Sequence, residues 1–200
     1  MVTHADDAFQ QVNEFARQTG WLHAPVTAYA KYGIVLFAVL LLVGWWLARS
    51  GPARTMAAAL LAPISTVLAV AINQPIVKHV AEARPYVVHP GAIVLVTKST
   101  DASFPSDHAT MAGAVAVGLC FVSWRLGLVA TICAVLMAAS RVYVGAHYPQ
   151  DVVAGLALGG VVALLVYLLL HSPTIWLVKR LRETRLGPVL ASGRTAIPAV

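Results

Sequence analysis

The stretch SRVYVGAHYPQDV, residues 140–152, places an arginine, a histidine and an aspartate between two long apolar runs. Ionisable groups close to a bilayer are costly, so their presence there needs a reason. Loop solubility or an interfacial anchor would explain any one of them. The segments on either side decide between these explanations and a functional site.

The composition of the chain is that of a membrane protein. Its 200 residues are 59% hydrophobic and only 11% charged, with a mean hydropathy of +0.77. Soluble domains carry about 25% charged residues. The sequence therefore indicates an integral membrane protein, with Cys120 and Cys133 as small residues inside apolar segments.

Five segments are apolar enough to cross a hydrocarbon core of about 30 Å as helices of about 20 residues. They cover residues 31–50, 54–78, 106–124, 126–143 and 151–171. The predicted fold class is all-α: a polytopic membrane helical bundle of five transmembrane helices plus an N-terminal amphipathic helix. We expect residues 1–177 to form one membrane-embedded domain and residues 178–200 a basic cytoplasmic tail.

Residues 5–20 differ in character from the spanning segments. Phe9, Val12, Phe15 and Ala16 recur at helical spacing, which indicates a short amphipathic helix. Two interpretations stay open for it. The helix lies on the membrane surface, or it caps the bundle as a packed element.

The distribution of charge gives an expected orientation. With five crossings, one side receives eight Lys and Arg residues and a single acid, whereas the other receives six cations and seven acids. The positive-inside rule counts only the cations. We therefore expect the C-terminus in the cytoplasm, and the N-terminus and the loops 79–105 and 142–150 outside a bacterial plasma membrane.

Polar clusters mark four predicted helix ends on the outer side: residues 78–85, 104–109, 140–147 and 148–151. Their convergence would bring three cations around two histidines, and these cations would repel one another without an anion between them. A phosphate group satisfies that demand because it accepts bidentate arginine contacts and a lysine point charge. The cations are Lys78, Arg84 and Arg141, and the histidines are His108 and His147.

The same residues offer the groups that phosphoryl transfer needs. Ser106 precedes an apolar run and is a candidate N-cap, and helix N-termini bind anions. Asp151 follows His147 by four residues, so a helix beginning near residues 148–149 would let the carboxylate hold one imidazole nitrogen and free the other to attack. His108 could then protonate the leaving oxygen. No cluster supplies the carboxylates that Mg²⁺ or Ca²⁺ prefers, so we expect no metal and no cofactor.

These residues match a known pattern, and the chain resembles the type 2 phosphatidic acid phosphatase superfamily, which also includes vanadium haloperoxidases. The superfamily signature is Lys-x6-Arg-Pro, Pro-Ser-Gly-His and Ser-Arg-x5-His-x3-Asp. The third part is matched in full from Ser140 to Asp151, and the second appears as residues 105–108 with Asp107 in place of glycine. The first appears as Lys78-x5-Arg84-Pro85, one residue short.

The resemblance implies an acid phosphatase/vanadium haloperoxidase-like core and a role for each matched residue. His147 would be the nucleophile that forms a phosphohistidine, Asp151 would orient it, and His108 would protonate the leaving group. The phosphate oxygens would be held by Lys78, Arg84, Ser106 and Arg141, and by Asp107 through its backbone N–H. The FPSDHA form is similar to that of bacterial undecaprenyl-diphosphatases linked to bacitracin resistance, which recycle the lipid carrier of cell-wall synthesis.

Several alternatives remain at this level. The substrate could instead be phosphatidic acid, phosphatidylglycerol phosphate or a polyprenyl-phosphosugar, and a non-catalytic resistance or transport subunit is the alternative from another class. The Gly155-x3-Gly159 pattern predicts close helix packing, either within the bundle or in a homodimer. Tyr86 and Tyr148 could line the substrate entrance, and no nucleic acid partner is expected.

Overall fold

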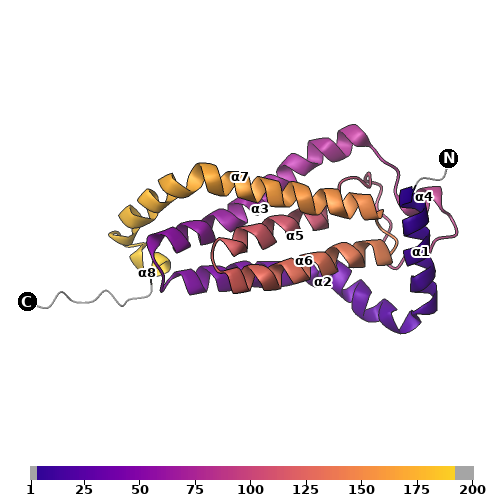
Figure 1. The fold of residues 1–200 in the computed structure, drawn as a ribbon, viewed down its shortest axis with the longest axis horizontal. Helices are drawn as coiled ribbons and strands as arrows, with labels where there is room; N and C mark the ends of the chain where they lie inside the picture. Colours follow the sequence, from indigo (N-terminus) through magenta and orange to yellow (C-terminus); the bar gives the residue numbers. More distant parts are fainter. Residues whose placement is uncertain (1–3, 192–200) are drawn as a thin grey trace, which may run out of the picture.

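The computed structural model describes residues 4–191 as a helical bundle, with no strand in that range. Figure 1 shows the long helices running side by side between two ends. The elements are α1 His4–Gln18, the 3-10 helix η1 Gly20–Leu22, α2 His23–Ala48, α3 Ala53–Val80, α4 Pro85–Val88, α5 Asp107–Cys120, α6 Trp124–Tyr143, α7 Pro149–Arg182 and α8 Gly187–Leu190. The predicted all-α fold class is confirmed.

Four helical segments of the described chain are long and apolar enough to cross a membrane: Gly20–Ala48, Ala53–Val88, Trp124–Tyr143 and Pro149–Arg182. The third predicted segment, residues 106–124, contains a helix of only 14 residues, α5. At 1.5 Å per residue it is about 21 Å long, shorter than the hydrocarbon core, although it returns the chain from the cavity end of α3 to the start of α6. Nine of its residues are buried, and it packs against α3, α6 and α7. Its apolar sequence serves the interior of the bundle instead of a lipid contact.

The contact between α5 and α7 depends on the two glycines at which close packing is predicted. A Cβ at Gly155 would lie 2.7 Å from the carbonyl oxygen of Ser106, and one at Gly159 would overlap the carbonyl oxygen of Thr110. Both glycines therefore let the backbones of α5 and α7 approach within one bundle. This internal packing brings the N-terminal ends of the two helices together.

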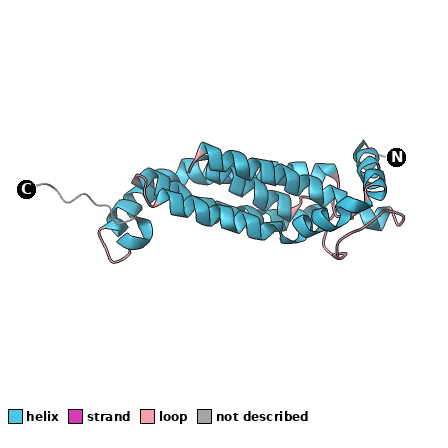
Figure 2. Cartoon of the chain, turned by 90° about the horizontal axis from the view of Figure 1, so that it is seen from below, coloured by secondary structure: helices cyan, strands magenta, loops and turns pink. Residues whose placement is uncertain are grey.

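Helix α1 crosses the end of the bundle at which α4 lies (Figure 1), and Figure 2 shows it transverse to the long helices. Its apolar face is inserted, with Phe9 only 1% exposed. The side-chain amide of Asn13 both donates to the carbonyl of Ile93 at 2.9 Å and accepts from its N–H at 3.0 Å. Of the two interpretations for residues 5–20, these contacts support the packed cap.

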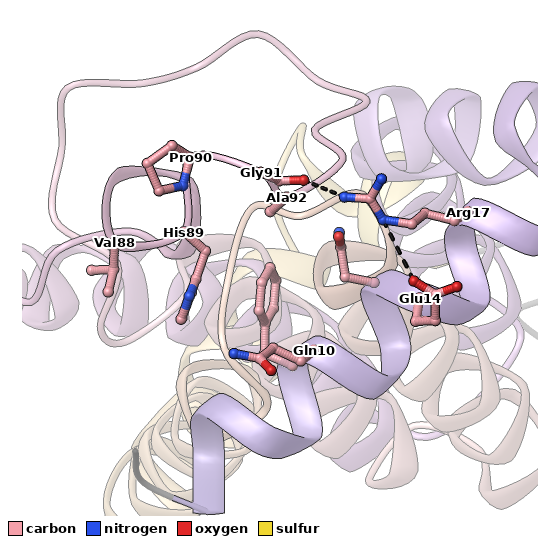
Figure 3. A pocket seen from close by; sticks show the side chains of 10 residues that line it. Gln10, Glu14, Arg17, Val88, His89, Pro90, Gly91 and Ala92 are labelled. Atoms are coloured by element: carbon pink, nitrogen blue, oxygen red, sulfur yellow. Dashed lines mark hydrogen bonds and ion pairs between the residues drawn. The ribbon is translucent and has the colours of Figure 1, made fainter. Parts of the chain in front are cut away.

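A hollow of about 490 Å³ lies between α1 and residues 88–92 (Figure 3). The guanidinium of Arg17 spans it, donating to the carbonyl of Gly91 and pairing with Glu14 at 3.6 Å. On the same side of the cap, the imidazole of His89 pairs with Asp6 at 3.2 Å and stacks on Phe9. These contacts hold the loop after α4 against the N-terminal helix.

The opposite end of the bundle carries the basic residues of α7 and the short helix α8. Arg49 donates to the carbonyl of Pro188 at 2.7 Å, and Arg182 donates to that of Gly51 at 3.1 Å. Helix α7 continues past Leu177 to Arg182, with Val178 buried. The division into a domain and a tail at this point stays a prediction, and its last nine residues, 192–200, lie outside the described chain.

Candidate active site

His147 lies in the five-residue connection between α6 and α7, and the start of α7 sets its surroundings. Tyr148 occupies the N-cap position and Pro149 the first helical position, as the sequence predicts. Asp151 is then one turn from His147, with 3.4 Å between Nδ1 of the imidazole and Oδ2 of the carboxylate. The N–H of Tyr148 donates to the same Oδ2 at 2.8 Å. The predicted pairing of the histidine and the aspartate is present.

Ser103 is a third residue at this pair, and the sequence analysis missed it. Its carbonyl oxygen lies 2.9 Å from Nδ1 of His147, closer than the carboxylate of Asp151. Its hydroxyl donates to Oδ2 of Asp151. Ser103 stands 44 residues before His147 in the chain, so no local spacing could connect them. The only sequence signal was a serine just before the 104–109 cluster.

These contacts decide which imidazole nitrogen carries the proton. The Ser103 carbonyl and the Asp151 carboxylate beside Nδ1 are acceptors, and the Ser103 hydroxyl beside it donates to that carboxylate, so Nδ1 carries the proton and Nε2 keeps its lone pair. Burial lowers the pKa of His147 below its usual 6.5, and the positive charges of Arg141 and Arg84 lower it further, whereas the hydrogen bond to Asp151 raises it. The neutral imidazole is the nucleophilic form.

Nε2 of His147 faces the guanidinium of Arg84, 3.3 Å from Nη1. Arg84 is the N-cap residue of α4, and two carbonyls fix its planar group: Asp101 accepts from Nε at 2.9 Å and Ala146 accepts from Nη1 at 3.1 Å. An anion beside Nε2 would therefore meet a preoriented cation.

A cavity of about 250 Å³ adjoins these groups. Arg141 enters it from the last turn of α6, buried to 8% exposure and anchored by a 3.2 Å bond from Nη1 to the carbonyl of Ala30. His108 lines the same cavity from the first turn of α5, as does Tyr86, whereas Tyr148 packs against Phe9 instead. Two arginines and two histidines from four separate segments thus share one cavity.

Ser106 begins α5 in the predicted N-cap position, although its side chain makes no capping bond. The hydroxyl is fully buried and has no protein partner among the described residues, and Ser106 lies behind the cavity lining rather than in it. Its backbone N–H donates to the carbonyl of Asp151 at 3.1 Å, which joins the starts of α5 and α7. A buried hydroxyl without a partner at a helix N-terminus is suited to contact an anion.

Asp107 turns its carboxylate toward α3. Oδ1 accepts from the side-chain amides of Asn73 at 2.7 Å and Gln74 at 2.9 Å, and the residue still lines the cavity. The two amides hold the negative charge at the α3 side of the cavity wall. The expectation that the backbone N–H of Asp107 faces a phosphate stays a prediction.

Lys78 is a predicted phosphate ligand that the structure turns away from the site. It is exposed in the last turn of α3 and is absent from the cavity lining, whereas Val77 lines the cavity. A spacing of six residues before Arg84 would have put the lysine at position 77. The shortened motif thus turns the lysine by about 100° away from the cavity.

Comparison with known proteins agrees with this geometry. The family model described as PAP2 superfamily matches residues 58–174, more than half of the chain. The undecaprenyl-diphosphatase BcrC of Bacillus subtilis (strain 168) is 30% identical over 179 residues, which cover 88% of this chain and 91% of that protein.

Two solved structures share the fold. LpxE of Aquifex aeolicus superposes with a TM-score of 0.62 at 22% identity, covering 80% of this chain and 92% of that one. A transmembrane PAP2 type phosphatidylglycerolphosphate phosphatase of Bacillus subtilis gives a TM-score of 0.57 at 23% identity, covering 82% and 85%. The matched family model, the relative over nearly the whole chain and the shared bundle place this chain in the PAP2 superfamily of membrane phosphatases.

Proposed function

We propose that this chain hydrolyses a polyprenyl diphosphate, such as undecaprenyl or decaprenyl diphosphate, to the monophosphate and inorganic phosphate. The observation that carries the mechanism is the environment of His147, whose Nδ1 is held by acceptors while Nε2 faces Arg84 at a cavity shared with His108. The similarity to a relative named undecaprenyl-diphosphatase over 88% of the chain supports the substrate.

In the first step, Nε2 of His147 attacks the terminal phosphorus of the diphosphate. The P–N bond forms as the bridging P–O bond breaks, and the electron pair leaves on the oxygen of the lipid monophosphate. Burial, and then the charges of Arg141 and Arg84, lower the pKa of His108 to about 3 in the free enzyme. The negative charge of the bound diphosphate raises this pKa so that His108 can donate a proton to that oxygen. Arg84, Arg141 and the hydroxyl of Ser106 stabilise the charge on the transferring phosphoryl oxygens.

In the second step, water attacks the phosphohistidine. His108, now neutral, accepts a proton from the water, the P–N bond breaks, and Nε2 recovers its lone pair. Inorganic phosphate then leaves the cavity. The carboxylate of Asp151 stabilises the positive charge that the imidazole ring carries while it is phosphorylated.

The site would serve carrier recycling if it faces outward from a bacterial plasma membrane. The cavity lies at the end of the bundle capped by α1, and the basic residues Arg49, Lys179, Arg180 and Arg182 lie at the other end. The excess of cations at that second end favours a cytoplasmic location for it. The phosphatase site then lies on the outer side, where the diphosphate form of the carrier is released.

The test is phosphate release from C55-polyprenyl diphosphate by the purified protein in detergent with excess chelator. We expect the wild type to release phosphate and His147→Ala to release none, because the nucleophile is lost. His79→Ala is the matched control, since His79 is an exposed histidine outside the cavity lining. It should retain wild-type activity.

The other outcomes separate the alternatives. Activity on phosphatidic acid, phosphatidylglycerol phosphate or a polyprenyl-phosphosugar without activity on the diphosphate would keep the mechanism and replace the substrate. A chelator-sensitive rate would contradict the metal-independent mechanism. A wild type inactive on every one of these lipids would favour a non-catalytic membrane subunit.

A further inference from the structure

Ser103 makes four hydrogen bonds at the catalytic pair and the loop beside it, one of them between its hydroxyl and Nδ1 of His147 at 3.4 Å. Its carbonyl accepts from Nδ1 of His147, its hydroxyl donates to Oδ2 of Asp151, and its N–H donates to the carbonyl of Glu82 at 2.8 Å. The side chain is fully buried. The residue is therefore fixed through its backbone to the loop after α3 while it touches both members of the pair.

The contact to Asp151 determines which way the carboxylate faces. Oδ2 is close to three donors, namely the hydroxyl of Ser103, the N–H of Tyr148 and Nδ1 of His147. Oδ1 is buried and has no partner among the described residues. The serine hydroxyl and the N–H of Tyr148 therefore hold Oδ2 on the side of the imidazole.

The contact to His147 gives Nδ1 two acceptors, the carbonyl of Ser103 and the carboxylate of Asp151. The Ser103 carbonyl is nearer to Nδ1 than the carboxylate is, at 2.9 Å against 3.4 Å. The carbonyl is thus the closer acceptor for the Nδ1 proton, and Asp151 contributes negative charge from slightly farther away. Without Ser103, the aspartate alone would have to accept the Nδ1 hydrogen bond and supply the negative charge.

We propose that Ser103 is a positioning residue for the nucleophile, with its carbonyl fixing the proton on Nδ1 of His147 and its hydroxyl fixing the carboxylate of Asp151. This inference rests on the proposed function, in which Nε2 of His147 attacks phosphorus. The serine touches neither the cavity nor the substrate, so its influence passes through the other two residues. It belongs to the catalytic arrangement together with them.

Ser103→Ala removes the hydroxyl and keeps the carbonyl. Partners that orient a ligating histidine are worth about tenfold or more, so kcat should fall about tenfold with KM unchanged. The hydroxyl also spreads the negative charge of Asp151. Without it the carboxylate attracts the imidazolium more strongly, and the acid limb of the kcat/KM profile should move to higher pH.

Three further variants make the comparison specific. Ser103→Thr keeps the hydroxyl and should restore kcat and the acid limb. Ser65→Ala removes an equally buried hydroxyl that donates only to Ala62 within α3, and both parameters should stay at wild-type values. In the Asp151→Asn background, Ser103→Ala should add little further loss, because the hydroxyl acts through the carboxylate.

The outcomes distinguish this inference from the function on which it rests. A wild type that releases no phosphate, or release that survives His147→Ala, overturns the proposed function. A working wild type, an inactive His147→Ala and an unaltered Ser103→Ala overturn the positioning role of the Ser103 hydroxyl and leave the proposed function standing. Should Ser103→Ala fail to fold, Ser103→Cys gives the same comparison at similar volume, because a thiol is a weak donor.

Discussion

Val77 and Lys78 are neighbours in the last turn of α3 but face different surroundings. Val77 is only 8% exposed and lines the cavity, whereas Lys78 is exposed and lies outside the cavity lining. Among the described residues, Arg84 and Arg141 are therefore the only lysine or arginine side chains that line the cavity. The two arginines must then hold the phosphate without the lysine of the family pattern.

Lys78→Ala should therefore have a small effect on activity. Surface charges contribute little once water and salt screen them, so we expect kcat/KM to stay within about threefold of the wild type. Arg84→Ala should lower kcat about 100-fold or more, because it removes a preoriented cation from the charge of the transition state. Steady-state phosphate release measures both. Equal losses in the two variants would show that Lys78 reaches the phosphate.

The carboxylate of Asp107 in the cavity wall leads to a prediction about how tightly the product phosphate binds. This carboxylate is held at the wall by Asn73 and Gln74, where it repels phosphate in the cavity. Asp107→Asn removes the charge and keeps an oxygen for the two amides. We expect inorganic phosphate to inhibit this variant about fivefold more tightly, which corresponds to about 1 kcal/mol of relieved repulsion. The inhibition constant of phosphate is the measurement, and weaker inhibition would contradict the repulsion.

The lowered pKa of His147 predicts the acid side of the pH profile. Because burial keeps the imidazole neutral below its usual pKa of 6.5, the nucleophile is available in mildly acidic solution. The acid limb of kcat/KM, which reports the free enzyme, should lie below pH 6.5. Asp151→Asn removes the contact that raises this pKa, so the limb should move to still lower pH while kcat falls about 100-fold. A limb above pH 6.5 in the wild type would contradict the neutral buried histidine.

The sequence predicted those parts of the site that depend on local geometry. The i, i+4 spacing of His147 and Asp151, with Pro149 able to begin a helix between them, was sufficient to place the carboxylate beside the imidazole. The contact of Ser103 was not predictable, because it depends on how the loop before α5 folds back over the start of α7.

Hydropathy also failed to separate a lipid-facing helix from a buried one. Both are apolar on all sides, and α5 has as many small apolar residues as a spanning segment although α3, α6 and α7 surround it. The missing signal was the length of the helix, because the apolar residues Phe121, Val122 and Trp124 follow its end and make the segment look longer. The spacing between Lys78 and Arg84 is one residue shorter than in the family pattern, and this single residue decides on which face of α3 the lysine lies.

The close approach of α5 to α7 gives the last prediction, because it brings His108 and Asp151 to the same end of the bundle. A Cβ at Gly159 would overlap the carbonyl of Thr110 and come within 2.8 Å of the backbone nitrogen of Ala114, and backbone atoms cannot move aside as a flexible side chain can. Gly159→Ala should therefore force the helices apart and destabilise the protein by about 1–3 kcal/mol.

Gly160→Ala is the matched control, since its Cβ would meet only the end of Val117 at 3.2 Å. The thermal unfolding midpoint in detergent measures the difference, and kcat should fall with it in Gly159→Ala because the starts of α5 and α7 separate. Equal midpoints for the two variants would show that the helices pack less closely than this structure has them.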